Sequence, residues 1–161
     1  MPHSLEKLTT ELGLALVSRE WKLATAESCT GGGVAYHITE ISGSSKWFER
    51  GFVTYSNLSK EELLGVSQAT LAEFGAVSEE TAKEMAEGAL ERSQAQVSVA
   101  VTGIAGPEGG SAAKPVGTVW FAWAGINKET QAQLHTLQGD RHAIRDQAIM
   151  IALQNLLVFI L

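Results

Sequence analysis

A short strand that runs straight into a glycine-rich turn and then into a helix is the feature that most constrains this chain. The strand is predicted over Lys22–Ala26, the turn over Glu27–Gly33 and the helix over Val34–Ile41. Glycine permits a tight backbone path, and the first amides of the helix point toward the turn, where they can bind an anion. The pattern therefore predicts an anion-binding or oxyanion-binding turn at the end of a strand.

Helices and strands alternate through the rest of the chain. Leucine spacing predicts a helix over Ser4–Glu20, and Ser59 and Glu62 have the spacing of a capping box that opens another helix. The last two strands are predicted to form a hairpin across Gly125–Glu129. This order indicates an α/β sandwich around about five strands, with a mixed sheet if the last pair is antiparallel. Further helices are predicted to follow Ser67, Ser78 and Asp140, and further strands to cover Trp47–Ser56, Val97–Val101, Thr118–Ala124 and Thr130–Gln138.

Length and charge limit the class of protein. The chain has 161 residues, 45% of them hydrophobic, and no linker divides it, so a single domain over residues 1–161 is expected. The formal net charge of −6 disfavours a general nucleic-acid coat protein, which must neutralise many phosphates. The segment Glu61–Glu91 carries eight acidic residues and one basic residue, so the rest of the chain is almost neutral. A pocket for one small anion is compatible with that distribution.

Cysteine content and apolar runs indicate where the protein works. Cys29 is the only cysteine, so an internal disulfide is impossible, which fits a reducing compartment. The N-terminus lacks the basic start and apolar run of a signal peptide. The apolar run Leu156–Leu161 is far too short to cross a bilayer. We therefore expect a cytoplasmic protein that makes no contact with a membrane.

The residue types that hold catalytic metals do not have the required spacing. The only two aspartates are Asp140 and Asp146, and the four histidines form no HExxH pattern. The P-loop signature and a GxGxxG fingerprint after a strand are also missing. These observations disfavour a metal hydrolase, and no metal or cofactor is predicted.

Ser28 is the first candidate nucleophile. It lies between the strand and the helix, where the amides of Thr30, Gly31 and Gly32 could stabilise an oxyanion. A serine nucleophile needs a base, and no histidine is close in sequence. On spacing alone, a simple helix cap is the favoured role of Ser28. Cys29 is the competing nucleophile, although a lone buried cysteine more often fills apolar space.

Tyr55, Asn57 and Lys60 form a second cluster, at the end of one strand and the start of a helix. A lysine can act as a general base when burial lowers its pKa, and a tyrosine hydroxyl can relay the proton. Serine with lysine is a known nucleophile and base combination. The alternative is a solvated lysine in the first helical turn, where its charge opposes the helix dipole.

A glycine-rich loop and an arginine complete the set of candidates. The loop over Gly103–Gly117 could form an anion-binding nest, or it could be a mobile surface loop. Arg141 follows a glycine and an aspartate at a predicted helix start, where it could bind a phosphate with two hydrogen bonds. Alone, such a residue is more often a surface arginine.

Six segments together resemble one family. They are AESCTGG (26–32), FERGFVTYSN (48–57), GAVSEETA (75–82), TGIAGPEGG (102–110), KPVGTVW (114–120) and GDR (139–141). The chain is thereby similar to the CinA C-terminal domain family, and more closely to its stand-alone members, the nicotinamide-nucleotide amidases of the PncC type. The resemblance implies a three-layer α/β/α sandwich and metal-independent deamidation of nicotinamide mononucleotide to nicotinate mononucleotide and ammonia, in pyridine-nucleotide salvage.

The resemblance also implies roles for individual residues. Ser28 would be the nucleophile, assisted by Tyr55 and Lys60. A pyridine mononucleotide would be the small-molecule substrate, and a homodimer would cover the apolar tail Leu156–Leu161. The residues implied in substrate binding are Thr30, Gly31, Gly32, Asn57, Thr102, Gly103, Gly106 and Arg141.

Two alternatives from other functional classes remain at this point. The chain could be a catalytically silent nucleotide-binding module linked to competence or DNA damage. It could also be an interaction protein that uses the acidic residues Glu79, Glu80 and Glu84.

Overall fold

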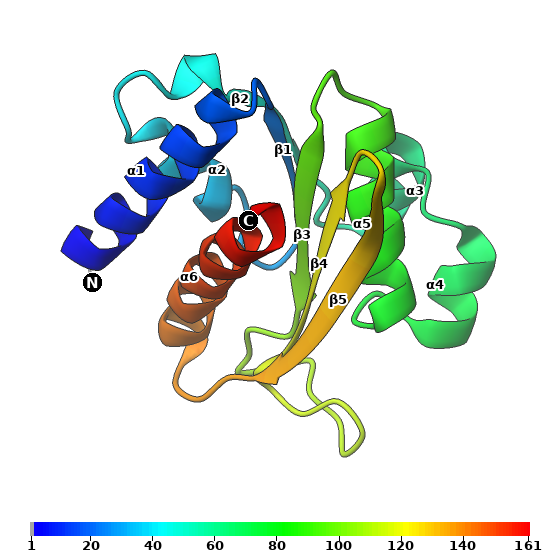
Figure 1. The fold of residues 1–161 in the computed structure, drawn as a ribbon. Coiled ribbons are helices and arrows are strands. Elements are labelled where there is room, and N and C mark those ends of the chain that lie inside the picture. Colours follow the sequence, from blue (N-terminus) through cyan, green and yellow to red (C-terminus); the bar gives the residue numbers. More distant parts are fainter. Residues whose placement is uncertain (1) are drawn as a thin grey trace.

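A five-stranded sheet lies between two layers of helices (Figure 1). The structure, a computed structural model, describes the backbone of residues 2–161 and the side chains from residue 5 onward. The strand order is β2-β1-β3-β4-β5, with β1 parallel to β2 and β3, and with antiparallel pairs β3–β4 and β4–β5. The predicted mixed sheet and three-layer sandwich are confirmed. The strands are β1 (Leu23–Glu27), β2 (Phe48–Val53), β3 (Val97–Gly103), β4 (Thr118–Gly125) and β5 (Lys128–Thr136).

The helices divide between the two faces of the sheet. Helices α1, α2 and α6 cover one face, and α5 covers the other, with α3 and α4 packed beside it (Figure 1). A short 3-10 helix, η1 (Ser44–Lys46), precedes β2. The helices are α1 (Pro2–Ser18), α2 (Gly33–Thr39), α3 (Asn57–Leu64), α4 (Gln68–Phe74), α5 (Glu79–Glu91) and α6 (Arg141–Ile160).

Side-chain size alternates along the central strands, because successive residues of a strand face opposite sides of the sheet. Large buried residues such as Val99 and Phe121 belong to the core shared with α1, α2 and α6. Buried alanines such as Ala100 and Ala122 face α5. The small residues let α5 approach the sheet closely, so both faces of the central strands are filled.

Serine and aspartate caps set the helix boundaries, and one predicted boundary is wrong. The Ser56 hydroxyl accepts a hydrogen bond from the Ser59 amide at 3.1 Å, so Ser56, not Ser59, is the N-cap of α3. The helix therefore begins three residues earlier, and Lys60 lies in its first turn. The predicted caps Ser78 and Asp140 are confirmed, and Ser67 caps α4.

Helix α6 is more apolar than its last residues suggest. By length and composition alone, the 20 residues of α6 could cross a membrane. The apolar run Leu156–Leu161, which is too short to do so, is only the end of this helix. The helix packs against α1 and the sheet, and Leu156, Phe159 and Ile160 are buried in the core. The core therefore accounts for the buried apolar residues of α6, whereas Val158 and Leu161 of the tail are exposed.

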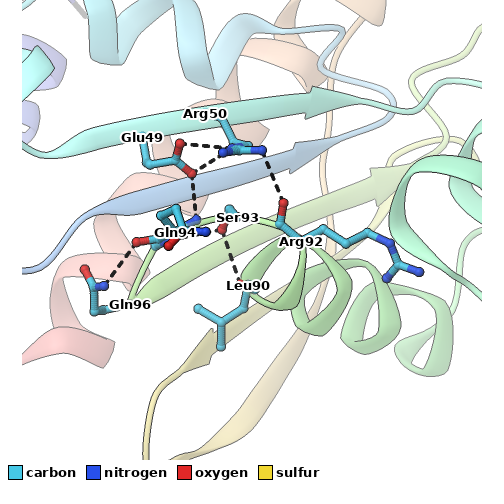
Figure 2. Close-up of polar contacts among 8 residues, drawn as sticks. Glu49, Arg50, Leu90, Arg92, Ser93, Gln94 and Gln96 are labelled. Atoms are coloured by element: carbon cyan, nitrogen blue, oxygen red, sulfur yellow. Dashed lines mark hydrogen bonds and ion pairs between the residues drawn. The ribbon is translucent and has the colours of Figure 1, made fainter.

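A polar network fixes the edge strand β2 to the loop that follows α5 (Figure 2). The Glu49 carboxylate accepts hydrogen bonds from Arg50 Nε at 2.7 Å and from the Gln94 amide at 2.9 Å. Arg50 also donates to the Arg92 carbonyl at 3.3 Å. The network lies near the start of β2, so it anchors the end of this strand that is remote from Tyr55.

Candidate active site

The candidate residues gather at the carboxyl ends of the three parallel strands. Ser28 follows β1, Thr54 and Tyr55 follow β2, and Thr102 and Gly103 end β3. Strands that run in parallel end at the same edge of a sheet, and ligands of open α/β sheets bind at that edge. The topology therefore brings together residues that lie far apart in the sequence.

Lys60 and Ser28 are in direct contact. Lys60 Nζ lies 3.0 Å from Ser28 Oγ, 3.0 Å from the Thr54 carbonyl oxygen and 3.2 Å from the Tyr55 carbonyl oxygen. A protonated lysine has three N–H groups and can donate to all three oxygens. A neutral lysine keeps two N–H groups for the two carbonyls, and its lone pair is then left to accept the Ser28 hydroxyl proton.

Burial favours the neutral form of the Lys60 amine. Its side chain is 1% exposed, and removal from water lowers the pKa of Lys60 below its ordinary value. The alternative of a solvated lysine in the first turn of α3 is therefore wrong. A buried lysine of lowered pKa, in contact with a hydroxyl, has the properties of a general base.

The favoured helix-cap role of Ser28 is also wrong. The N-cap of α2 is Gly32, and the Ser28 hydroxyl contacts Lys60 instead of a helix amide. Ser28 is 7% exposed and lines a cavity, so its hydroxyl contacts the Lys60 amine at the edge of that cavity. This is the arrangement that a serine nucleophile needs.

Glu27 caps α2 from the end of the preceding strand, a role that the sequence analysis missed. Its carboxylate accepts hydrogen bonds from the Val34 amide at 2.8 Å, from the Ala35 amide at 3.0 Å and from the Thr30 hydroxyl at 2.6 Å. The available signal was an acidic residue at the end of a strand of small apolar residues. Such a residue is rarely buried unless donors satisfy it.

Cys29 does not have the properties of a competing nucleophile. It is 7% exposed, and burial raises the pKa of its thiol to about 11. The thiolate is the reactive form of cysteine, and at neutral pH this side chain holds its proton. Cys29 therefore has the character of the apolar filler that was the expected alternative.

A cavity of about 290 Å³ joins most of the candidate residues. Its walls come from the turn after β1, the start of α3, the end of β3 and the glycine-rich loop. Thr30, Gly31 and Gly32 are not among its lining residues. The predicted site residues that line it are Ser28, Tyr55, Asn57, Lys60, Thr102, Gly103, Gly106 and Arg141.

The turn after Ser28 is held by its own hydrogen bonds and by an arginine from α6. The Gly31 amide donates to the Ser28 carbonyl at 3.1 Å, so this amide is engaged within the turn. Arg145 donates to the Cys29 carbonyl at 3.0 Å and to the Thr30 carbonyl at 3.4 Å. Arg145 is not among the residues predicted from the sequence, although it follows Arg141 by one helical turn and thus lies on the same side of α6.

Arg141 links three parts of the cavity wall. It donates to the Gly106 carbonyl at 2.8 Å and to the Tyr55 hydroxyl at 3.3 Å. The Tyr55 side chain is 64% exposed, and its contact with Lys60 is made by the peptide carbonyl. A proton relay through the Tyr55 hydroxyl stays a prediction.

Backbone hydrogen bonds join the two ends of the glycine-rich loop. The Ile104 amide donates to the Thr118 carbonyl at 2.9 Å, and the Gly117 amide donates to the Ile104 carbonyl at 2.8 Å. Beside it, the buried Thr102 hydroxyl donates to the Ala76 carbonyl at 2.8 Å. The two ends of the loop are thus pinned together, and its first residues form one wall of the cavity.

Other candidate features are engaged in structural contacts. In the part of the chain that the structure describes, no group of three or more histidine, cysteine, aspartate or glutamate side chains is arranged to hold a metal ion. Glu84 accepts hydrogen bonds from the Ser67 amide and the Thr70 hydroxyl, so it holds α4 to α5. Glu79 pairs with Lys83 at 2.8 Å.

Comparison with known proteins identifies the family. The model of the CinA C-terminal domain matches residues 5–160. The chain belongs to the CinA C-terminal domain family. The resemblance inferred from the six sequence segments is thereby confirmed, and the family assignment extends over almost the whole chain.

Two relatives match along more than nine-tenths of their own length. The chain is 54% identical over 153 residues to a nicotinamide-nucleotide amidohydrolase PncC from Enterobacter agglomerans, covering 95% of this chain and 93% of the relative. It is also 54% identical to the protein of the same name from Escherichia coli K12, covering 94% and 92%. A crystal structure of the competence/damage inducible protein CihA from Agrobacterium tumefaciens is 46% identical, with a TM-score of 0.93, and covers 96% of this chain and 94% of that chain.

Proposed function

We propose that this member of the CinA family is an amidohydrolase that converts nicotinamide mononucleotide to nicotinate mononucleotide and ammonia, in pyridine-nucleotide salvage. The reaction class rests on the 3.0 Å contact between Lys60 Nζ and Ser28 Oγ beside a cavity. The substrate is supported by the 54% identity to proteins named nicotinamide-nucleotide amidohydrolase. In this proposal Ser28 is the nucleophile and Lys60 the general base.

The first half of the reaction forms an acyl-enzyme. Ser28 Oγ attacks the carboxamide carbon, and the hydroxyl proton moves to neutral Lys60 Nζ. The positive pyridinium ring withdraws electrons from the amide and makes that carbon more electrophilic. The Lys60 ammonium then gives its proton to the departing nitrogen, which leaves as ammonia when the tetrahedral intermediate collapses.

The second half regenerates the enzyme. Lys60 is neutral again, and it takes a proton from a water molecule that attacks the ester carbon. Collapse of this intermediate returns the proton from Lys60 to Ser28 Oγ and releases the carboxylic acid, which gives its remaining proton to solvent and leaves as nicotinate mononucleotide. The carbonyls of Thr54 and Tyr55 keep Lys60 Nζ in one position through both halves, because each accepts one of its N–H groups.

Backbone amides of the turn after Ser28 are the proposed oxyanion donors. The Gly31 amide already donates to the Ser28 carbonyl, so the proposed donors are the amides of Thr30 and Gly32, which follow Ser28 closely although neither residue lines the cavity. Arg145 holds the Cys29 carbonyl, and the Thr30 amide belongs to the same peptide plane. The arginine thereby fixes the direction in which that amide points.

Tyr55 and Arg141 would contact the rest of the substrate. Tyr55 assists Lys60 through its carbonyl, and its exposed phenol lies beside Arg141 at the cavity wall. Arg141 presents a planar cation that can bind a phosphate with two hydrogen bonds. The remaining proposed contacts come from Asn57 and the backbone of Gly103 and Gly106.

An ammonia-release assay with nicotinamide mononucleotide tests the proposed function directly. We expect ammonia and nicotinate mononucleotide in equal amounts, and an unchanged rate after treatment with a chelator, because the proposed chemistry uses only side chains and backbone amides. Titration calorimetry with the same compound runs in parallel. Binding without turnover would contradict the proposal and favour the silent nucleotide-binding module. A strong loss of rate with the chelator would contradict metal independence.

Arg141→Ala is expected to weaken binding of the phosphate with little effect on chemistry. Loss of a charge-assisted hydrogen bond costs about 1.5–3 kcal/mol, which predicts a rise in KM of about 10-fold to 100-fold with kcat changed less than about 3-fold. The matched control is nicotinamide riboside, which has no phosphate and should react similarly with wild type and variant. An equal loss with both compounds would show that Arg141 does not act through the phosphate.

A further inference from the structure

Glu27 is a buried carboxylate that directly precedes the proposed nucleophile. Its side chain is 1% exposed, and none of the ion pairs found within the described residues includes it. A buried charge of this kind is costly unless hydrogen-bond donors satisfy it. Three donors do so here, the Thr30 hydroxyl and the amides of Val34 and Ala35.

These three donors enclose the turn that carries Ser28. The two amides belong to the first turn of α2, where helix amides lack partners within the helix. The Thr30 hydroxyl lies two residues after Ser28 and donates to Glu27 at 2.6 Å. The carboxylate therefore ties both the turn and the start of α2 to the end of β1, with Ser28 between the tied points.

The backbone of the same residue reaches the base. The Glu27 carbonyl accepts a hydrogen bond from the Thr54 amide at 2.8 Å, and the Thr54 carbonyl accepts one from Lys60 Nζ at 3.0 Å. The side chain of Glu27 thus holds the turn that carries Ser28. Its main chain holds Thr54, whose carbonyl orients Lys60. Glu27 therefore bonds both to the turn that carries Ser28 and to the Thr54 peptide, whose carbonyl accepts a hydrogen bond from Lys60.

We infer that Glu27 is a positioning residue that sets Ser28 Oγ in register with Lys60 Nζ. The inference rests on the proposed function, because it assigns Glu27 to the reaction of that same pair. Glu27 does not contact the proposed substrate and takes no proton in the reaction. Its contribution is geometric, so its loss lowers the fraction of molecules in which the nucleophile faces the base.

Three substitutions separate this role from general stability. Glu27→Gln keeps the size of the side chain but turns one acceptor into an N–H donor that faces other donors. Thr30→Val removes only the hydroxyl contact, and Thr30→Ser restores it. We expect kcat to fall about 10-fold to 100-fold in Glu27→Gln and about 3-fold to 10-fold in Thr30→Val, with KM within about 2-fold and with recovery in Thr30→Ser.

The matched control is Ser67→Ala, which removes the hydroxyl that caps α4 by accepting a hydrogen bond from the Ala69 amide at 3.1 Å. Ser67 is not among the residues that line the cavity, so we expect a loss of stability with unchanged kcat. The same loss of kcat in Ser67→Ala would overturn the inference, because the effect would then follow stability. Unchanged kcat in both Glu27→Gln and Thr30→Val would also overturn it.

Hydrogen exchange of the native protein tests the inference without relying on turnover. Amides in the segment 29–35 should exchange at least about 10-fold faster in Glu27→Gln than in wild type, and at wild-type rates in Ser67→Ala. Unchanged exchange there would overturn the inference even in an active enzyme. Absence of ammonia release by wild type would instead contradict the proposed function, and faster exchange would still support the structural hold of Glu27 on the turn.

Discussion

Ser28→Ala is expected to lower ammonia release from nicotinamide mononucleotide by about 10⁴-fold or more. The substitution removes the atom that attacks the carboxamide carbon, and a water molecule would have to attack in its place without the same positioning. The variant should still fold, because the loss of one hydrogen bond to Lys60 costs about 1 kcal/mol. The measurements are kcat and KM by ammonia release, with circular dichroism to confirm folding.

Cys29→Ala is the matched control for that experiment. It alters the neighbouring side chain in the same turn, and we expect kcat within about 3-fold of wild type because the buried thiol has a raised pKa and is not a nucleophile. Wild-type turnover by Ser28→Ala would contradict the serine mechanism. Loss of turnover in Cys29→Ala, with the variant folded, would transfer the role of nucleophile to the thiol.

Local patterns predicted the elements of this fold well. Short apolar runs predicted β3 and β4, and Ser78 and Asp140 predicted the starts of α5 and α6. These signals depend on neighbours within a few residues in the chain. The start of α3 shows the limit of such signals, since Ser56 and Ser59 are both plausible caps and the backbone path after β2 decides between them.

Contacts across the sheet could not be derived from spacing. Ser28 and Lys60 are 32 residues apart, and Arg145 is 116 residues from the Cys29 carbonyl that it holds. Their meeting depends on the parallel pairing of β1 with β2 and on the packing of α6 above the turn. On spacing alone, a helix cap was therefore the better prediction for Ser28, and only the family resemblance pointed to the nucleophile.

Helix capping by Glu27 was missed for a related reason. Standard caps act over two or three residues, whereas Glu27 accepts from amides seven and eight residues later. The glycines at the usual cap position have no side chain that could do this. A buried acidic residue just before a glycine turn is therefore a signal that the cap comes from the strand.

Lys60→Met is expected to lower kcat by about 10²-fold to 10⁴-fold, the usual contribution of a general base. Methionine matches the length and apolar character of the lysine stem but cannot take the Ser28 proton. In wild type, kcat should rise with pH as Lys60 loses its proton, with a midpoint below the ordinary lysine pKa of about 10.4. The residual activity of Lys60→Met should lack this rise.

Lys60→Arg distinguishes a base from a fixed positive charge. The guanidinium keeps its charge at every accessible pH and cannot accept a proton, so this variant should be about as inactive as Lys60→Met. Lys114→Met is the control for loss of a lysine near the cavity, since Lys114 donates to the Phe74 carbonyl and does not contact Ser28. It should retain the wild-type pH profile. Activity of Lys60→Arg near that of wild type would contradict a base at this position.

The same lysine makes stability depend on pH in a defined direction. Burial lowers the pKa of Lys60 in the folded state, so between that value and the ordinary pKa the unfolded chain binds more protons. The cost of burying Lys60 is therefore fully present below the folded pKa, and it disappears as pH rises to the ordinary value. The free energy of unfolding of Lys60→Met relative to wild type should fall from about pH 6 to about pH 10 in urea titrations. If this difference in the free energy of unfolding stays constant over the range, Lys60 has the same pKa in the folded protein as in the unfolded chain. Neutral Lys60 would then be too rare near pH 7 to serve as the base.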